Sequence, residues 1–271
     1  MSAPYCRTSG NLQEPAHLIV ENATVAYGPR SALQDVTFCV PVGTSVAVIG
    51  PNGAGKSTLF KALVGLLPLR KGSIMIHGLP LGHHLDCVAY VPQREEVDWH
   101  FPVTVADVVM MGRYGRLGWL KWPGRKDRAA VASCLEKLGI SDLASLPIDS
   151  LSGGQQQRVF LARALVQEPH IVLMDEPFTG VDISTQETTL ALFTQLKEQQ
   201  VTVLISTHDL SLATTQFDQV LLLNRRLIVC GPPDEVLTSQ TLTEAFGGQV
   251  LFLNGAVVVD KAVHKTRPYK G

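Results

Sequence analysis

The stretch that decides the fold is Gly50-Pro51-Asn52-Gly53-Ala54-Gly55-Lys56-Ser57-Thr58. It follows the apolar run 45–49, which predicts a buried strand, and it precedes residues 59–64, which predict a helix. A glycine-rich loop between a strand and a helix can turn its backbone N–H groups around a phosphate, and the helix N-terminus adds a positive partial charge. The stretch therefore predicts a phosphate-binding loop.

The loop matches the nucleotide-binding pattern at its fixed positions, which are Gly50, Gly55, Lys56 and Ser57. Lys56 would supply a mobile cation for the outer phosphates, and the Ser57 hydroxyl would ligate magnesium. A plain glycine-rich turn is the alternative, but the strand before the loop and the helix after it argue against that interpretation. We therefore expect a nucleoside triphosphate to bind at Gly50, Pro51, Asn52, Gly53, Ala54, Gly55, Lys56, Ser57 and Thr58.

The composition indicates a globular protein with a substantial core. Of the 271 residues, 45% are hydrophobic and 17% are charged, which excludes wholesale disorder. A net charge of −1 gives no reason to expect a nucleic-acid partner. No apolar run approaches the roughly 18 residues of a membrane span, and residues 1–14 lack the apolar core of a signal peptide. The five cysteines are scattered without a CxxC pair, which is typical of reduced thiols in a cytosolic protein.

The apolar patterns divide the chain into parts. Residues 18–27 and 32–40 predict strands of an antiparallel sheet. Between residues 91 and 165 the pattern becomes helical, with apolar residues at helical spacing over 127–138. Short, nearly continuous apolar runs predict parallel strands covered on both faces, at 45–49, 171–175, 201–206 and 220–223. The expected parts are a polar N-terminal extension (1–16), an α/β core (17–245) with an inserted helical subdomain (about 95–160), and a C-terminal extension (246–271).

Two acids follow the apolar run 171–174. A buried strand that ends in Asp175 and Glu176 delivers carboxylates at its C-terminal end, where α/β sheets place ligand groups. Asp175 is suited to hold magnesium through water, and Glu176 is suited to polarise the water that attacks the terminal phosphate. Many strands end in an acid, so this assignment depends on the phosphate-binding loop upstream.

A second strong motif is Leu151-Ser152-Gly153-Gly154-Gln155. Ser152 can cap a helix, and the two glycines expose backbone N–H groups at its start, which makes an anion site. The structural alternative is an ordinary serine-capped helix.

These three motifs together resemble the ATP-binding-cassette family of transport ATPases, over about residues 17–245. The resemblance implies a RecA-like P-loop core with an antiparallel β subdomain and an inserted α-helical subdomain. It also implies ATP and Mg²⁺ as ligands, and a homodimer that holds two ATP molecules. In that family the segment that corresponds to Ser152, Gly153, Gly154 and Gln155 closes on the ATP held by the phosphate loop of the other subunit.

The resemblance implies roles for four further residues. Tyr27 would stack its ring on adenine, with a plain strand-end aromatic as the alternative. Gln93 would ligate the magnesium and sense the γ-phosphate, and His208 would contact the γ-phosphate and hold the attacking water. Asp182 would contact the other subunit, although Thr179-Gly180-Val181-Asp182 departs from the Ser/Ala-Leu-Asp stretch usual in the family.

The cargo is indicated only by residues 91–115, which read VPQREEVDWHFPVTV and then, from Asp107, DVVMMGRYG. This stretch resembles the manganese- and zinc-type branch of bacterial metal-ion importers. It implies the ATPase subunit of an importer for a divalent metal, with manganese as the first choice. Iron-chelate importers and exporters of lipids or drugs are the alternatives.

An importer of this kind implies further partners. They are integral membrane permease subunits, which would hold the chain at the cytoplasmic face of the inner (plasma) membrane, and an extracytoplasmic substrate-binding protein. A cassette protein of DNA repair would need a long coiled-coil insertion, and a ribosome-associated one would carry two phosphate loops in one chain. This sequence has neither feature.

Two groups of residues have no role in this nucleotide chemistry. Residues 113–128 contain six basic residues and one acid, with Trp119 and Trp122 interleaved. This pattern favours contact with a membrane partner or lipid headgroups, with a solvated loop as the alternative. The second group consists of His77, His83, His84 and Cys87. We interpret it as a surface turn rather than a metal site, because a transported metal would pass through the permease and not through the ATPase.

Overall fold

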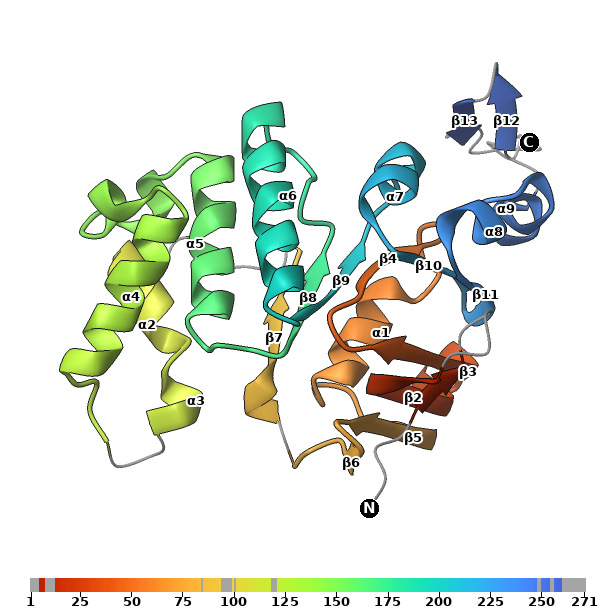
Figure 1. The fold of residues 1–271 in the computed structure, drawn as a ribbon, viewed down its shortest axis with the longest axis horizontal. Coiled ribbons are helices and arrows are strands. Elements are labelled where there is room, and N and C mark those ends of the chain that lie inside the picture. The colour runs from red at the N-terminus through yellow and green to blue at the C-terminus, as the bar shows by residue number, and fades with distance from the viewer. Residues whose placement is uncertain are drawn as a thin grey trace, which may run out of the picture.

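The structure is a computed structural model that describes residues 5–7, 13–83, 85–93, 99, 101–117, 121–247, 250–253 and 256–259. A six-stranded sheet forms its core, in the strand order β11-β10-β4-β9-β8-β7 (Figure 1). Its bounds are β4 (Ser45–Ile49), β7 (Val88–Val91), β8 (Ile171–Asp175), β9 (Thr202–Ser206), β10 (Gln219–Asn224) and β11 (Arg226–Gly231). All neighbours pair in parallel except β11, which runs antiparallel to β10.

The central strands are buried on both faces. Every residue of β4, β8 and β9 is buried. Along β4, Val46 and Val48 pack into one apolar cluster, whereas Ala47 and Ile49 pack into another. This alternation follows from the period of two along a strand, and it confirms the prediction of a covered parallel sheet.

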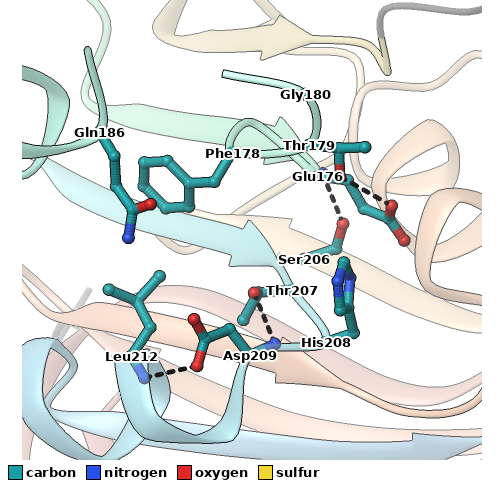
Figure 2. A pocket seen from close by; sticks show the side chains of 10 residues that line it. All are labelled: Glu176, Phe178, Thr179, Gly180, Gln186, Ser206, Thr207, His208, Asp209 and Leu212. Carbon is teal, nitrogen blue, oxygen red and sulfur yellow. Dashed lines mark hydrogen bonds between the residues drawn. The ribbon is translucent and has the colours of Figure 1, made fainter. Parts of the chain in front are cut away.

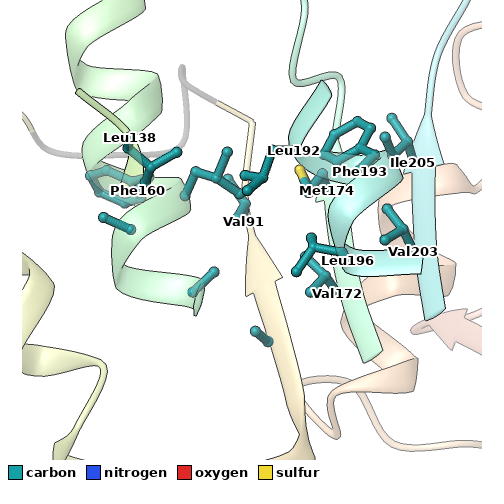
Figure 3. Close-up of a cluster of buried hydrophobic side chains, with 14 of the residues drawn as sticks. Val91, Leu138, Phe160, Val172, Met174, Leu192, Phe193, Leu196, Val203 and Ile205 are labelled. Atoms are coloured by element: carbon teal, nitrogen blue, oxygen red, sulfur yellow. The ribbon is translucent and has the colours of Figure 1, made fainter. Parts of the chain in front are cut away.

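Helices cover both faces of this sheet. The cluster on one face includes side chains of α1 (Lys56–Leu63), and the cluster on the other includes side chains of α5 (Gly153–Leu165), α6 (Ile183–Glu198) and α7 (Leu210–Gln216). Figure 3 shows part of the second cluster, where Phe160 of α5 and Leu192 of α6 lie near Val91 of β7 and Met174 of β8. Strand β8, which ends in Asp175, is therefore packed on both faces, with Val172 and Met174 in one cluster and Ile171 and Leu173 in the other.

A second sheet is antiparallel, as the sequence predicts. It consists of β1 (Tyr5–Arg7), β2 (Gln13–Tyr27), β3 (Arg30–Pro41), β5 (Lys71–Ile76) and β6 (Leu79–Pro80), with β3 paired to β2. Because β2 begins at Gln13, the expected limit of the N-terminal extension at residue 16 falls inside this strand. The expectation of reduced thiols is wrong for Cys39, which is disulfide-bonded to a partner outside the described side chains. Cys87, Cys134 and Cys230 are free.

The helices between residues 105 and 165 pack against one another at the β7 edge of the core (Figure 1). They are α2 (Val105–Met111), α3 (Tyr114–Leu117), α4 (Arg125–Lys137) and α5, with short 3₁₀ turns at Ser141–Leu143 and Ile148–Ser150. Thr104 caps α2, with a side chain that accepts from Asp107 N at 3.2 Å. Arg113 ties α4 to the end of α5 through ion pairs with Asp127 (3.1 Å) and Glu168 (3.3 Å).

The C-terminal part completes the described chain. A 3₁₀ turn at Leu85–Cys87 precedes β7, and helices α8 (Pro233–Val236) and α9 (Ser239–Phe246) follow β11. Beyond them, β12 (Val250–Leu253) and β13 (Ala256–Val259) form an antiparallel pair, in a segment where the sequence has no motif that we can assign. Among the described helices, none combines the length and apolar character that crossing a bilayer requires.

Candidate nucleotide-binding and catalytic site

The phosphate-binding loop joins β4 to α1, and two of its glycines are required by close packing. A Cβ on Gly50 would lie 2.0 Å from the carbonyl oxygen of Leu223, closer than any real contact. Gly55 has φ of 99°, and a Cβ there would lie 2.5 Å from Leu33 Cδ2. The loop therefore keeps its shape only with glycine at these two fixed positions.

Lys56 is the charged group at the centre of the loop. Its Nζ donates to the carbonyl oxygens of Gly50 (2.8 Å) and Pro51 (3.3 Å), and its side chain is buried. Burial lowers the pKa of this amine, and the nearby carboxylates of Glu176 and Asp175 act in the opposite direction. The two acids at the end of β8 are thus close enough to the loop to affect its cation.

A cavity of about 580 Å³ opens over the loop. Its volume lies within the range of small-molecule sites, about 300–1,000 Å³. Gln93, which follows β7, and Glu176, which follows β8, both line it. The remaining lining residues are Ala32, Asn52, Gly53, Ala54, Gly55, Lys56, Ser57 and Thr58. The phosphate loop, Gln93 and Glu176 therefore meet at the C-terminal ends of three parallel strands, which is where α/β sheets bind ligands.

Asp175 lies fully buried next to this cavity. Its Oδ1 accepts a hydrogen bond from the Ser206 hydroxyl at the end of β9. Its Oδ2 is buried and has no hydrogen-bond partner among the described residues. An unpaired buried carboxylate oxygen costs about 1–3 kcal/mol, more when it is charged, so this atom requires a cation or water. The oxygen atoms of Asp175, Ser57 and Gln93 are the donor types that Mg²⁺ prefers.

Ser206 is a site residue that the sequence analysis did not single out. Its Oγ donates to Asp175 and accepts from the backbone N of Glu176 at 2.9 Å, so one hydroxyl orients both acids. The only signal in the sequence is a polar residue that ends an otherwise apolar run.

Glu176 is held in an unusual backbone conformation, with φ of 47°. Its Oε2 accepts from the Thr179 hydroxyl at 3.3 Å. Glu176 also lines a second, smaller cavity of about 230 Å³, together with His208 (Figure 2). A non-glycine residue in the left-handed region is strained, and such strain is typical of functional positions.

His208 follows β9 and lines the second cavity; it is not among the described residues that line the cavity over the loop. Figure 2 shows its ring on the same side of this cavity as the Glu176 carboxyl group. The loop around it is fixed because Asp209 N donates to Thr207 Oγ1 (3.1 Å) and Asp209 Oδ1 caps α7 at Leu212 N (2.9 Å). Glu176 thus lies between the nucleotide loop and His208.

The Leu151–Gln155 motif forms the N-terminus of α5, where Ser152 is the cap. Ser152 N donates to Gln155 Oε1 at 2.8 Å, and Gln155 N donates back to Ser152 Oγ at 3.4 Å. A Cβ on Gly154 would lie 2.8 Å from Thr185 Oγ1, so Gly154 packs directly against the start of α6. Among the described residues that line the cavity over the phosphate loop, none comes from this motif.

Asp182 and Tyr27 also lie outside that cavity. Asp182 caps α6, with carboxylate oxygens that accept from Thr185 N and Thr185 Oγ1, both at 2.9 Å. It therefore adjoins Gly154 of its own chain, where a Cβ would lie 3.3 Å from Asp182 Oδ2. Tyr27 ends β2 and is 53% exposed.

The fold and this site define a P-loop ATPase of the cassette type, because the nucleotide core carries both an antiparallel β subdomain and a helical subdomain. The ABC transporter family model matches residues 33–179, which is more than half of the chain. The chain belongs to this family, as the sequence motifs predict.

The relatives of the chain include proteins named for metal transport. It is 47% identical to the manganese transport system ATP-binding protein MntB of Bacillus subtilis, over 89% of this chain and 96% of that one. It is also 47% identical to the zinc transport system ATP-binding protein TroB of Treponema pallidum, over 85% and 87% of the two chains. Among solved structures, an inward-facing metal-chelate type ABC transporter superposes with a TM-score of 0.76 at 30% identity, covering 89% of this chain and 94% of that one.

Proposed function

We propose that this chain is the ATP-hydrolysing subunit of an importer for a divalent metal ion, with manganese as the first candidate. The observation that carries the proposal is the 47% identity to a manganese transport ATP-binding protein along nearly the full length of both chains. A relative named for chelated iron transport, in Yersinia pestis, is 43% identical over 88% of this chain, so the chelate branch is the second candidate.

In this proposal the nucleotide binds over the loop, and each residue has a distinct task. Lys56 leaves the carbonyls of its own loop to meet the outer phosphates of ATP. Asp175, Ser57 and Gln93 hold Mg²⁺, which would neutralise charge on the phosphates when bound. Glu176, oriented by Ser206, polarises the attacking water, and His208 holds that water against the γ-phosphate.

The second half of each ATP site comes from another copy of the chain. Support comes from the start of α5, which presents backbone N–H groups and yet does not line the cavity of its own chain. In a homodimer, Ser152, Gly153, Gly154 and Gln155 close on the ATP of the partner. Asp182 adjoins this motif and would lie at the same interface, and Tyr27 would stack on the adenine.

The remaining partners follow from the same proposal. Permease subunits hold the ATPase dimer at the cytoplasmic face of the inner (plasma) membrane, and a substrate-binding protein delivers the metal from outside. Trp122 supports a docking surface next to α4, because its side chain is 92% exposed. Tryptophan is enriched at protein interfaces and at membrane surfaces, because its ring is apolar and its N–H is polar. Trp119 belongs to the same predicted surface and lies outside the described residues.

The test is metal accumulation in cells that lack this gene. Complementation with the wild-type chain should restore uptake of one metal, measured by elemental analysis after growth in limiting manganese, zinc or iron. Complementation with Glu176→Gln should restore none, because the protein assembles without turnover. Restored manganese alone supports the proposal, whereas restored iron only in the presence of a chelator would replace it with the chelate branch. Faster efflux of a preloaded lipid or drug would indicate an exporter.

A further inference from the structure

Three histidines from distant parts of the sequence meet at the end of the core sheet opposite the nucleotide loop. His17 lies in β2, His77 follows β5, and His170 directly precedes β8. Each offers one ring nitrogen, and these nitrogens all lie within 4.8 Å of one another. Because β8 runs for five residues from His170 towards Glu176, the cluster is about 17 Å from the acids, at about 3.3 Å per residue.

The spacing of the nitrogens matches that of metal ligands. His17 Nε2 lies 3.2 Å from His77 Nε2, and His170 Nδ1 lies 2.9 Å from the same His77 nitrogen. Two imidazole nitrogens bound to one tetrahedral Zn²⁺ at about 2.0–2.1 Å lie about 3.3 Å apart. Small movements of the two exposed rings, His77 and His170, would place all three nitrogens around one cation.

A buried hydroxyl holds the His17 ring through one of its two nitrogens. His17 Nδ1 lies 2.6 Å from Thr202 Oγ1. Thr202 Oγ1 accepts from Gly43 N (3.0 Å), and its single proton is within reach of Pro41 O (3.2 Å) as well as of His17 Nδ1. When the hydroxyl donates to Pro41 O, the proton between His17 and Thr202 belongs to His17 Nδ1, which leaves a lone pair on Nε2 towards the other two rings. Metal-binding histidines are oriented in this way by a partner for the second ring nitrogen.

Protons alone do not satisfy this cluster. With the proton on His17 Nδ1, the Nε2 atom can only accept, so the hydrogen bond at 3.2 Å requires His77 Nε2 to donate. The same His77 nitrogen faces His170 Nδ1 at 2.9 Å and would have to share its one proton between two acceptors. A single cation bound to three lone pairs removes this conflict.

Backbone hydrogen bonds fix the positions of the three residues. His77 N donates to His17 O at 3.0 Å, and His170 N donates to Cys87 O at 2.8 Å. Thr202 N donates to His170 O at 2.9 Å, so the residue that orients His17 is also bonded to His170. The ligands therefore come from ordered strands and tight turns, which gives a preorganised site.

We propose that His17, His77 and His170 form a binding site for one divalent transition-metal cation, with Zn²⁺ as the best match. Neutral imidazoles favour Zn²⁺, Ni²⁺ and Cu²⁺, whereas Mg²⁺ and Mn²⁺ favour oxygen ligands, so this site is chemically distinct from the nucleotide site. The cation would tie the antiparallel subdomain to the start of β8. His77 lies in an exposed turn, as the sequence analysis expects, and its ring partners are 60 and 93 residues away in the sequence.

The test is titration of untagged, nucleotide-free protein with Zn²⁺ by calorimetry and with Co²⁺ by visible absorption. We expect one equivalent of each metal, a rise in the unfolding temperature with Zn²⁺, and cobalt d–d bands without a thiolate charge-transfer band. His77→Asn and His170→Gln should abolish this binding, and the matched control His83→Asn should leave it unchanged. Asparagine is chosen at residue 77 because it tolerates the left-handed conformation found there, with φ of 51°.

A second pair of variants tests the hydroxyl that orients His17. Thr202→Val should weaken Zn²⁺ binding about 10- to 100-fold, and Thr202→Ser should retain it. The proposal is overturned if the wild type binds no equivalent of Zn²⁺, if both histidine variants bind like the wild type, or if the cobalt spectrum reports a thiolate. If circular dichroism shows that one histidine variant is unfolded, Zn²⁺ binding by the other variant decides whether the proposal holds.

Discussion

Replacement of Ser206 by alanine tests the catalytic arrangement more directly than replacement of either acid. Ser206 is fully buried, and its hydroxyl makes one hydrogen bond to Asp175 Oδ1 and one to Glu176 N. Ser206→Ala leaves the charge and identity of both acids unchanged. It removes only the group that holds them in place.

The structure sets the size of the expected effects. The alanine leaves the Glu176 N–H and Asp175 Oδ1 unpaired in a buried region, which should lower the free energy of unfolding by about 2–4 kcal/mol. Freed from this bond, the backbone at Glu176 can relax from its strained φ of 47° and move the carboxylate. A displacement of about 1 Å can cost up to about 100-fold, so we expect kcat to fall about 10- to 100-fold.

Ser45→Ala is a matched control, because Ser45 makes the same pair of bonds at the other end of the sheet. Its hydroxyl donates to Asp218 Oδ2 at 2.8 Å and accepts from Asp218 N at 3.1 Å. We expect it to lower the free energy of unfolding by about 1–2 kcal/mol and to leave turnover unchanged. Phosphate release per folded molecule and urea unfolding would be measured for both variants. Equal turnover in the wild type and Ser206→Ala would refute the positioning role of Ser206.

Four further predictions concern the nucleotide site and the docking surface. Glu176→Gln should bind ATP normally, abolish turnover and accumulate as an ATP-bound dimer on size-exclusion chromatography; turnover near the wild-type rate would exclude Glu176 as the group that polarises water. Gly55→Ala should weaken ATP binding at least about tenfold, because its Cβ would overlap Leu33. The Cβ of Gly53→Ala would meet no atom within 4 Å, so this variant should bear only the left-handed backbone strain of about 1–2 kcal/mol. Calorimetric titration with ATP would compare the two variants. A mixture of Lys56→Ala and Ser152→Arg chains should recover ATP binding at one intact composite site, and a mixture without any ATP-dependent dimer would count against pairing in trans. Changing both Lys121 and Trp122 to alanine should keep ATP affinity within about twofold, a difference below about 0.5 kcal/mol, and weaken co-purification with the permease; unchanged co-purification and metal uptake would make the segment a solvated loop.

The parts of the fold that could be predicted are those with a local pattern. The nearly continuous apolar runs at 171–175 and 45–49 predict β8 and β4 to the residue, because the interior of a strand covered on both faces must be apolar. The helix expected at 127–138 is found at Arg125–Lys137. The start of β2 could not be predicted, because residues 13–16 pair at the polar margin of the sheet, where no apolar alternation marks a strand.

In the site, motifs made of consecutive residues could be predicted, whereas groups of residues that only the fold brings together could not. The phosphate loop is a motif of consecutive residues, so Lys56 and Ser57 can be assigned to it from the sequence alone. Gln93 and Glu176 are 83 residues apart, and only the parallel pairing of β7 with β8 brings them to one cavity. The histidine cluster is harder still, since its members lie in or next to strands of two different sheets and no pair of them is close in sequence.

Buried hydroxyls at strand ends offer a signal that connects these observations. Ser206 and Thr202 bound the apolar run of β9, and Ser45 begins β4. A buried hydroxyl needs partners, and at a strand end the sheet no longer supplies them all, so the partner is often a side chain. Each of these three hydroxyls bonds a titratable group: a carboxylate at Asp175, an imidazole at His17 and a carboxylate at Asp218. A serine or threonine that interrupts the edge of an apolar run therefore indicates that an ionisable side chain lies beside it, even where that side chain is more than 150 residues away, as His17 is from Thr202.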